Sequence, residues 1–384
     1  MYKRQASIIN DAIKANASDI HIDPTDEGAD VRYRIDGVLH CVKQLPADGR
    51  DALVARFKIM ADIPLTRSGM PQDGRILVRI DDRDYDLRVT TVPVMCGEKI
   101  TMRILNKNFS TIRLDQLDFL PEQLEKVREL LHQRNGIIIS TGPVASGKTT
   151  LLYSMVMDLI KPEINIMTIE DPVEWQINGL KQVQVDRKAG LTFPAAMRAI
   201  MRHDPDIIMV GEIGDAETMK LCAYAAMTGH LVLSQMLTPD TLSVPQNIAA
   251  YGVDPWLIGS SLIGVVGSVL LRKNCADCME EYTPSDEALE FLGLKDLAGK
   301  KKFYHGVGCE KCKQSGFRGR VQLHEVLPID RQLGRLISSG QTDPGVLLNH
   351  ATSKGFITMI EDAKRRILKG ETTAEEAFLM LMMR

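Results

Sequence analysis

Several features that define special classes of protein are missing from this sequence of 384 residues. The formal net charge of −3 lacks the positive excess typical of proteins that bind a nucleic-acid backbone. Seven cysteines are too few for a disulfide scaffold in a chain of this length. No apolar stretch follows the basic start Met1–Gln5, so we expect no signal peptide at this end. The sequence also contains no internal repeat and no low-complexity segment.

One uncharged apolar run, Trp256–Leu271, contains 16 residues, whereas a helix that spans a bilayer needs about 20. Its glycines and serines suit a helix that packs closely inside a protein. We therefore predict a buried helix here, a soluble protein, and membrane attachment only through a partner. Residues 1–5 have two interpretations: a non-native start encoded by an adapter, in place of a missing amino-terminal part, or a plain short basic start.

What is present is an ordinary globular balance of 44% hydrophobic and 25% charged residues, with length for two or three domains. Residues 6–105 alternate apolar and polar residues at the strand period, which predicts a small α+β domain. Residues 106–118 are polar and lack a strong period, so we predict a linker. Residues 119–384 alternate short apolar strands with helices, which predicts an α/β domain whose sheet is covered on both faces and whose tail, 332–384, is helical. Predicted helices cover 7–16, 48–61, 121–134 and a segment ending at 159, and predicted strands cover 19–22, 31–39 with a turn at Asp36-Gly37, 74–80, 84–90, 99–105, 136–140, 164–169, 181–185, 207–210 and 231–234.

The segment Gly142–Thr149 (GPVASGKT) matches G-x-x-x-x-G-K-[ST] at every fixed position, between an expected strand and an expected helix. Glycines allow backbone N–H groups to turn toward phosphates, and the following helix directs its positive dipole end at the same charge. We predict that Lys148 reaches the terminal phosphates of ATP and that Thr149 ligates Mg²⁺. A glycine-rich turn that binds nothing is the alternative. The predicted nucleotide-binding residues here are Gly142, Ser146, Gly147, Lys148, Thr149 and Thr150.

Acidic residues follow two apolar strands, at the positions where parallel α/β sheets bind their ligands. Glu170 and Asp171 come after one strand, and Glu212 comes shortly after Ile207–Val210. A metal-bound triphosphate needs one carboxylate for the Mg²⁺ shell and another to orient or deprotonate water. We predict that these acids converge on the phosphate loop, and their alternative role is to cap the next helix.

Four cysteines form two C-x-x-C pairs, Cys275 with Cys278 and Cys309 with Cys312. Four thiolates complete a tetrahedral Zn²⁺ shell and leave no open position for chemistry. We therefore predict a structural zinc in a subdomain of residues 272–322, with unrelated free cysteines as the alternative. The other three cysteines are predicted to be small buried hydrophobic residues: Cys41, Cys96 and Cys222.

Several motifs occur in a fixed order along the chain: SDIHID at 18–23, VRYRIDG at 31–37, PQDGR at 71–75, TIEDPVE at 168–174, RAIMRHDPDIIMVGEI at 198–213 and TGHLVLS at 228–234. Together with the paired cysteines, they resemble the motifs of the secretion ATPases, which drive type II secretion and assemble type IV pili. The resemblance covers nearly the whole chain from residue 6. It implies a PAS-like amino-terminal domain, a RecA-like P-loop ATPase domain, and a ring of six subunits with ATP between neighbouring domains. Paired cysteines are typical of the assembly and secretion members rather than of the pilus-retraction members.

The resemblance implies a role for each matching residue. Glu170 would position the attacking water with Asp171 beside it, and Glu212 would be the Walker B acid. Arg75 and Arg88 match arginines of the smaller domain that approach the γ-phosphate, although a solvated strand face is the alternative. The cofactors implied are ATP, Mg²⁺ and Zn²⁺, and the protein implied is a cytoplasmic homohexamer, peripheral at the inner membrane through platform and docking proteins.

The sequence also departs from the family pattern. His230 keeps the histidine of the family's Thr-Gly-His element. It has two possible roles: a residue of the nucleotide site, or a core histidine whose hydrogen bonds are satisfied within the protein. Gly214 stands where the family has an arginine, Leu237 replaces a histidine, and Gly267-Ser268-Val269 replaces Gln-Arg-Leu. Nucleotide binding should survive these changes, because the phosphate loop is whole. The alternatives to a motor are therefore a nucleotide-binding scaffold with weak hydrolysis and a RecA-like nucleic-acid translocase, which the net charge disfavours.

Overall fold

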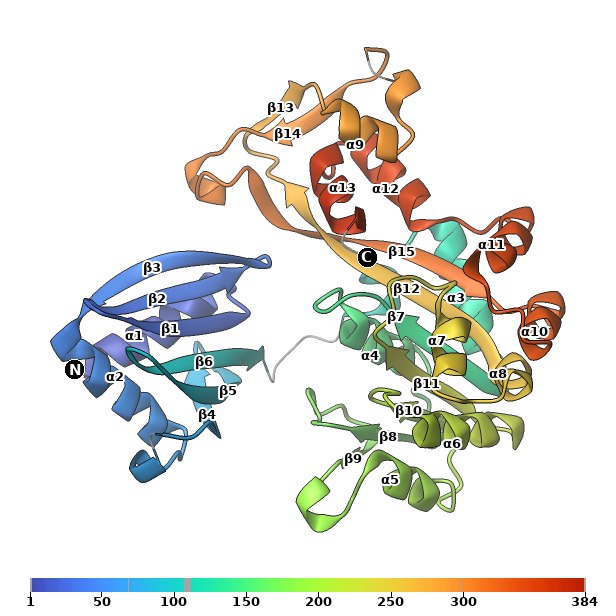
Figure 1. Ribbon diagram of the computed structural model, residues 1–384, viewed down its shortest axis with the longest axis horizontal. Coiled ribbons are helices and arrows are strands. Elements are labelled where there is room, and N and C mark those ends of the chain that lie inside the picture. The colour runs from blue at the N-terminus through green and yellow to red at the C-terminus, as the bar shows by residue number, and fades with distance from the viewer. Residues whose placement is uncertain (1, 68, 107–111, 298, 383–384) are drawn as a thin grey trace. The chain divides into compact units, whose positions relative to one another are not determined.

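The computed structural model describes residues 2–67, 69–106, 112–297 and 299–382. The chain divides into two compact units, Met1–Ser110 and Thr111–Arg384, each with its own sheet and core (Figure 1). The first unit is a six-stranded antiparallel sheet in the order β3-β2-β1-β6-β5-β4, with two helices and a short 3₁₀ turn. Its elements are α1 Tyr2–Lys14, β1 Asp19–Thr25, β2 Gly28–Ile35, β3 Val38–Pro46, α2 Ala47–Met60, η1 Leu65–Arg67, β4 Gln72–Ile80, β5 Arg83–Val94 and β6 Gly97–Asn106.

The two faces of this first sheet differ because side chains alternate along each strand. Ile20 and Ile22 of β1 belong to the core that the sheet forms with both helices. The intervening residues of β1, among them Asp19 and His21, face the opposite side, which carries most of the charged groups. The predicted turn at Asp36-Gly37 joins β2 to β3, and both residues have positive φ, 47° and 85°, as a tight hairpin turn requires.

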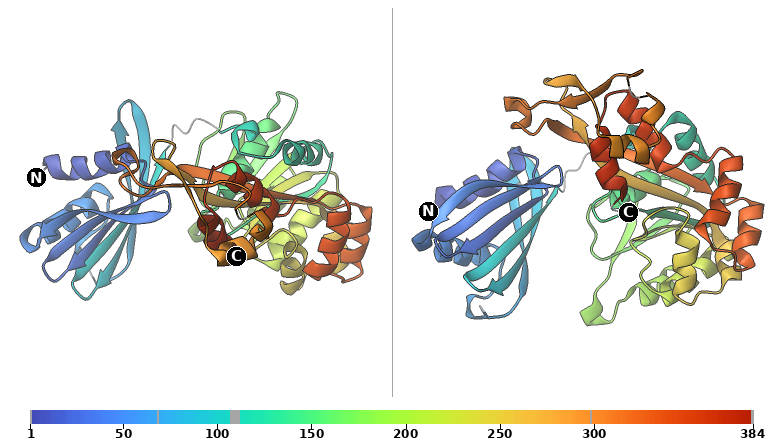
Figure 2. Two further views of the ribbon diagram at one scale, coloured as in Figure 1. Left: turned by 90° about the horizontal axis from the view of Figure 1, so that it is seen from above. Right: turned by 45° about the horizontal axis from the view of Figure 1, so that its top comes forward.

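The second unit is built on a seven-stranded sheet in the order β15-β12-β7-β11-β10-β8-β9, in which only β15 pairs antiparallel (Figures 1 and 2). Ile137 and Ile139 of β7 face a core with the helices that follow the inner strands, whereas Ile138 faces a second core on the other side. The predicted two-sided α/β sheet is thus confirmed. The elements are η2 Leu114–Gln116, α3 Pro121–Leu131, β7 Gly136–Thr141, α4 Lys148–Asp158, β8 Ile166–Glu170, β9 Lys181–Gln184, η3 Arg187–Ala189, α5 Phe193–Ile200, β10 Ile207–Val210, α6 Ala216–Met227, β11 Leu231–Met236, α7 Val244–Ala250, α8 Pro255–Ser261 and β12 Leu262–Asn274.

Most of the remaining elements form a smaller layer around the far ends of β12 and β15, with a hydrophobic cluster of its own. The exceptions are α10 and α11, whose buried residues belong to the core that the main sheet forms with α6 and α8. The predicted helical tail is confirmed over the part of 332–384 that the structure describes. Part of the predicted linker 106–118, residues 107–111, lies outside the described residues. The later part of the prediction is wrong, because Leu114 and Leu117 are buried in the core of the second unit. These elements are β13 Met279–Tyr282, α9 Asp286–Phe291, η4 Lys295–Leu297, β14 Phe303–Gly306, η5 Glu310–Cys312, β15 Phe317–Pro328, α10 Arg331–Ser338, α11 Pro344–Ser353, α12 Met359–Leu368 and α13 Ala374–Met382.

The prediction of one buried helix over Trp256–Leu271 is wrong. The helix α8 ends at Ser261, and the rest of the run is the strand β12, buried between β7 and β15. A strand covered on both faces is apolar at every position, so its sequence resembles that of a buried helix. Gly264 allows close packing here, because a Cβ on it would lie 2.4 Å from the side chain of Leu130. Among the residues described, no helix is both long and apolar enough to cross a bilayer.

The predicted burial of the three unpaired cysteines is correct only for Cys222, which lies fully buried in α6. Cys41 is exposed and Cys96 is half-buried. Cys41 lies in β3, the edge strand of the first sheet, whose side chains are mostly exposed.

Candidate functional site

The loop Gly142–Thr149 connects β7 to α4 in a shape that only small residues permit. Gly142 and Gly147 have φ of 144° and 90°. A Cβ on Gly142 would lie 2.3 Å from the backbone oxygen of Ser268, and one on Gly147 would lie 2.6 Å from Nε2 of Gln322. The hydroxyl of Ser146 is buried inside this loop and has no hydrogen-bond partner among the described residues. Glycine backbone and an unpaired polar atom are what a phosphate cradle requires, so the loop fits its predicted ligand.

Lys148 is the first residue of α4, and its ammonium group bends back over the loop. Its Nζ donates hydrogen bonds to the backbone oxygens of Gly142, at 3.0 Å, and Pro143, at 2.6 Å. Burial lowers the pKa of Lys148 to about 8, because few polar groups replace the lost water. The cation is therefore held inside the loop, beside the positive end of the α4 dipole, where an anion would be stabilised by both.

The carboxyl ends of the parallel strands meet beside this loop. Thr141 at the end of β7 pairs in register with Met236 of β11, and one strand further Ser234 pairs with Val210 of β10. Val210 in turn pairs with Ile169 of β8. The next residues along β10 and β8, which include the predicted acids, therefore project from the same edge of the sheet as the phosphate loop.

Glu170 ends β8 and is almost completely buried, with 3% of its surface exposed. Its carboxylate accepts hydrogen bonds from the hydroxyl of Tyr153 on α4, from Thr168 Oγ1 at 2.5 Å and from Gln182 Nε2 at 3.0 Å. The neighbouring Asp171 is partly exposed and pairs with Arg187 at 3.1 Å. Of the two adjacent acids, Glu170 is thus the more rigidly held.

Glu212 follows β10 through Gly211 and is exposed. The backbone N–H of the next residue, Ile213, donates to the backbone oxygen of Gln235 at 3.0 Å. The side-chain oxygen of Gln235 also accepts from Thr149 Oγ1, at 3.5 Å. Gln235 therefore connects the segment that bears Glu212 to the hydroxyl predicted to ligate Mg²⁺.

His230 lies at the wrong edge of the sheet for the predicted role. It precedes β11, and its backbone oxygen accepts from Gly136 N at the start of β7. The six residues of β11 separate it from the loop by about 20 Å, at ~3.3 Å per residue. Its Nδ1 lies 2.9 Å from the backbone oxygen of Ala225, so the alternative of a satisfied structural histidine describes it. The geometry removes His230 from the nucleotide site of its own chain.

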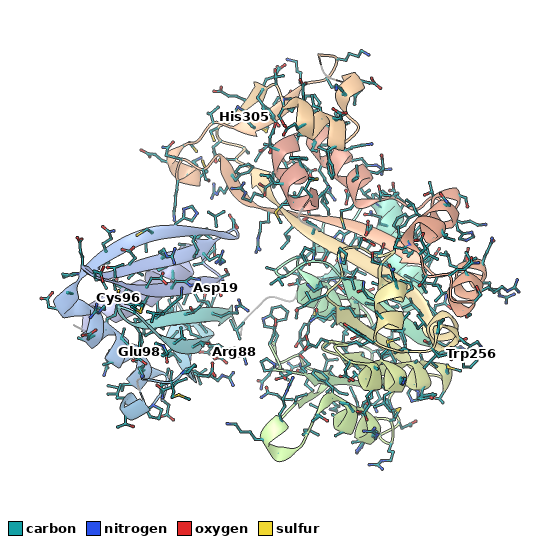
Figure 3. The ribbon with its side chains drawn as sticks, in the orientation of Figure 1. Asp19, Arg88, Cys96, Glu98, Trp256 and His305 are labelled. Atoms are coloured by element: carbon teal, nitrogen blue, oxygen red, sulfur yellow. The ribbon has the colours of Figure 1, made fainter. Side chains whose placement is uncertain are left out.

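The two predicted arginines belong to a row that crosses the open face of the first sheet. In register, Arg75 pairs with Arg88, Arg88 with Arg103, and Arg103 with Asp19. Figure 3 shows Asp19 and Arg88 on this sheet, and the row borders a pocket of about 710 Å³. Arg75 pairs with Asp86, and Arg103 donates to Asp19 at 3.0 Å. Within the described residues Arg88 has no such partner, so its guanidinium is available to an anion.

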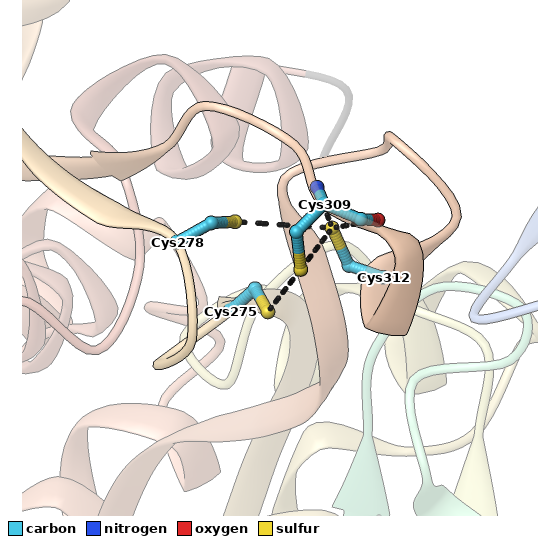
Figure 4. A group of neighbouring side chains, drawn as sticks. All are labelled: Cys275, Cys278, Cys309 and Cys312. Atoms are coloured by element: carbon cyan, nitrogen blue, oxygen red, sulfur yellow. Dashed lines mark hydrogen bonds between the residues drawn. The ribbon is translucent and has the colours of Figure 1, made fainter.

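The four paired cysteines come together at one point beside β12 and β15 (Figure 4). Their sulfurs all lie within 4.8 Å of one another, with 3.9 Å between Cys275 and Cys309 and 3.9 Å between Cys278 and Cys312. A tetrahedral zinc with Zn–S bonds of about 2.3 Å places its sulfurs about 3.8 Å apart. The donor set therefore fits Zn²⁺ in both chemistry and spacing.

Sequence reasoning assigned no site role to several residues that the fold brings to these sites. Arg103 and Asp19 belong to the arginine row, and the strand period could have predicted them once the register was known. Ser268 of β12 and Gln322 of β15 each donate to the backbone oxygen of Ser146, both at 3.2 Å. These contacts join the phosphate loop to strands far from it in the sequence, and no local sequence pattern predicts them.

Three comparisons place the chain among known proteins. The family model described as "Type II/IV secretion system protein" matches residues 2–379. The chain is 40% identical over 370 residues to the type IV pilus assembly ATPase PilB of Thermus thermophilus, and 39% identical over 370 residues to type II secretion system protein E of Dickeya dadantii. Both matches cover 96% of this chain, but they span 42% and 73% of the two relatives.

Solved structures show the same fold. The ATPase DotB of Legionella pneumophila has a TM-score of 0.73 at 21% identity, covering 99% of this chain and 95% of that one. The pilus retraction motor PilT with bound ADP has a TM-score of 0.64 at 24% identity, covering 97% and 96%. The family model and the relatives, whose names are those of secretion and pilus assembly proteins, show that the chain belongs to the type II/IV secretion system family of ATPases.

Proposed function

We propose that this chain is an ATP-hydrolysing motor subunit that powers type IV pilus assembly or type II protein secretion. The observation that carries the proposal is one sheet edge that joins a complete phosphate loop to Glu170 of β8 and Glu212 beyond β10. Membership of a family with secretion and pilus assembly ATPases supports the same conclusion.

Each residue at this edge has a distinct task in the proposed reaction. The backbone of Gly142–Thr149 and the ammonium group of Lys148 hold the phosphates, and Thr149 and Glu212 would hold Mg²⁺ directly or through water. Mg²⁺, when bound, neutralises charge on the phosphate oxygens. Glu170 orients the attacking water, with Asp171 beside it.

Arg88 and its row supply positive charge from the first unit. An arginine delivered by a moving domain stabilises the charge of the transition state and makes hydrolysis depend on domain closure. We propose that this closure is the working stroke, in a ring of six copies at the cytoplasmic face of the inner membrane, attached through platform and docking proteins. The proposed domains are residues 6–105 with a PAS-like fold and a RecA-like ATPase domain at 119–384, into whose core Leu114 and Leu117 of the predicted linker pack.

The tetracysteine cluster is proposed to hold one structural Zn²⁺. Cys275 and Cys278 follow β12 directly, and Cys309 and Cys312 precede β15. A metal shared by both pairs would join the ends of these two strands, where the hydrophobic cluster is small.

A turnover assay on the purified chain tests the proposal. Glu170→Gln and Lys148→Ala should each reduce ATP hydrolysis by at least about 100-fold, while only Lys148→Ala should abolish nucleotide binding. Binding without turnover in the wild-type chain, unchanged by Glu212→Gln, would instead identify a scaffold. The scaffold hypothesis is supported by Leu237, which replaces the family histidine and is 65% exposed just beyond β11.

The nucleic-acid translocase is the weaker alternative. The net charge of −3 opposes it, although the arginine row is a local basic feature. Titration with labelled single-stranded DNA at low and at physiological salt decides the question. Absence of binding at both salts removes this alternative, since phosphate contacts strengthen steeply as salt falls.

A further inference from the structure

The carboxylate of Glu170 is held by donors from three different elements. Tyr153 of α4 donates its hydroxyl to Oε2, whereas Thr168 of β8 and Gln182 of β9 both donate to Oε1. Gln182 is itself fixed, because its Nε2 also donates to the backbone oxygen of Trp175 at 2.9 Å and its Oε1 accepts from Ile177 N at 2.9 Å. The position of Oε1 is therefore set by the edge of the sheet, and that of Oε2 by the helix.

These contacts leave few places for a water molecule. A carboxylate offers about four acceptor sites, two on each oxygen. Thr168 and Gln182 occupy both sites of Oε1, and Tyr153 occupies one of the two sites of Oε2. The remaining site lies on the oxygen that the tyrosine hydroxyl fixes. A water oriented by Glu170 must therefore bind next to Tyr153.

Tyr153 is well suited to act as a permanent donor. It is 3% exposed, and its ring packs edge-on against Trp175 with centroids 4.8 Å apart. Burial and the charge of Glu170 raise the pKa of Tyr153, so that the phenol keeps its proton. The helix that carries it begins at Lys148, so one rigid element bears both the phosphate-binding cation and the donor to Glu170.

We infer that Tyr153 is a positioning residue for ATP hydrolysis, which holds Oε2 of Glu170 so that its remaining acceptor site orients the attacking water. This inference rests on the proposed function and adds a residue to the same site. Under a purely structural role, the hydroxyl of Tyr153 would only satisfy a buried polar group. The two roles differ in what they predict for kinetics.

Tyr153→Phe removes the hydroxyl and keeps the ring. We expect kcat to fall roughly tenfold, while KM and the nucleotide Kd change by less than about twofold. Tyr282→Phe is the matched control, because Tyr282 also donates its hydroxyl to a glutamate, the half-buried Glu375, at 2.5 Å, but lies on β13 away from the phosphate loop. The control should leave kcat unchanged. An unchanged kcat in Tyr153→Phe overturns the inference.

A double-mutant cycle shows whether Tyr153 acts through Glu170. In a Glu170→Gln background, Tyr153→Phe should lower the residual kcat by less than about twofold, because the group that it positions is already lost. A full tenfold loss in both backgrounds, together with a lower melting temperature, would assign Tyr153 a structural role only and overturn the inference.

A structure of the wild-type chain bound to ATPγS and Mg²⁺ tests the role of Tyr153 independently of the proposed ATPase function. If the wild-type chain does not hydrolyse ATP, the motor proposal fails, and the inference is judged on this complex. A Tyr153–Glu170 hydrogen bond with a water on Oε2 supports it. A tyrosine hydroxyl beyond hydrogen-bond distance of Glu170 overturns it, whatever the turnover.

Discussion

The buried lysine of the phosphate loop should make nucleotide affinity depend on pH between 7 and 9. Burial lowers the pKa of Lys148 to about 8, whereas a lysine in water titrates near ~10.4. Only the charged form donates three hydrogen bonds and neutralises phosphate oxygens. The affinity for nucleotide should therefore be highest below the pKa of Lys148 and should decline as pH rises through that value.

The size of the effect follows from the charged fraction. If Kd is inversely proportional to that fraction, it is multiplied by about 1.1 at pH 7 and by about 11 at pH 9, a net increase of roughly tenfold. Folding stability changes in the opposite direction. The folded-state pKa lies below the unfolded value of 10.5, so the buried cation destabilises the fold fully below pH 8, and this penalty disappears as pH rises toward 10.5.

The assay is a titration with a fluorescent ATP analogue from pH 7 to pH 9 at constant ionic strength. Lys148→Arg is the matched control, because a guanidinium stays charged over this range. Its affinity should be weaker but independent of pH. A wild-type Kd that changes by less than about twofold, or an equal change in Lys148→Arg, would refute the reasoning.

Three further predictions concern separate parts of the chain. Gly147→Ala should weaken nucleotide binding roughly tenfold or more, because φ is 90° and the new Cβ meets Gln322, whereas Gly340→Ala, with φ of 86° and open space around it, should affect only stability; equal nucleotide affinities in the two variants would contradict this. Arg88→Ala should lower kcat roughly 10³-fold with little change in nucleotide Kd, whereas Arg79→Ala, on the same sheet and 68% exposed, should not; equal rates would leave Arg88 as a solvated arginine. Metal analysis should find one zinc per chain, lost in Cys309→Ser but kept in Cys41→Ser, and its removal should lower the melting temperature by roughly 5 °C or more; a zinc-free wild-type chain with the same melting temperature would exclude the structural metal.

The sequence predicted best where the signal is local. The phosphate loop needs only its own glycines, and Glu170 and Glu212 were located because each follows a short apolar strand. The prediction of a helix over Trp256–Leu271 was wrong because a strand buried on both faces has no hydrophobic period that distinguishes it from a buried helix. The prediction of His230 as a nucleotide-site residue was wrong for a different reason. His230 precedes its strand, so the direction of the strand already placed it at the edge of the sheet opposite the phosphate loop.

Other parts of the site depend on pairing that no local pattern contains. The row of Arg75, Arg88 and Arg103 exists only because β4, β5 and β6 pair in one particular register. A shift of one residue in β5 would turn Arg88 toward the core and separate the row. Two of the three donors to Glu170 likewise come from α4 and β9, which the sequence places on either side of β8.

The positions of the three departures from the family pattern indicate which step they affect. Gly214 has nothing within 4 Å of a Cβ built on it, and Leu237 is 65% exposed, so both lie where a neighbouring molecule could approach. Ser268 is instead fully buried and donates to the backbone of the phosphate loop, as a residue that supports the cradle would. Gly214 and Leu237 therefore concern groups that reach the nucleotide from outside the subunit, whereas Ser268 supports the loop from within it. In the proposed ring, a lowered turnover should come from weak coupling between subunits rather than from weak binding of ATP.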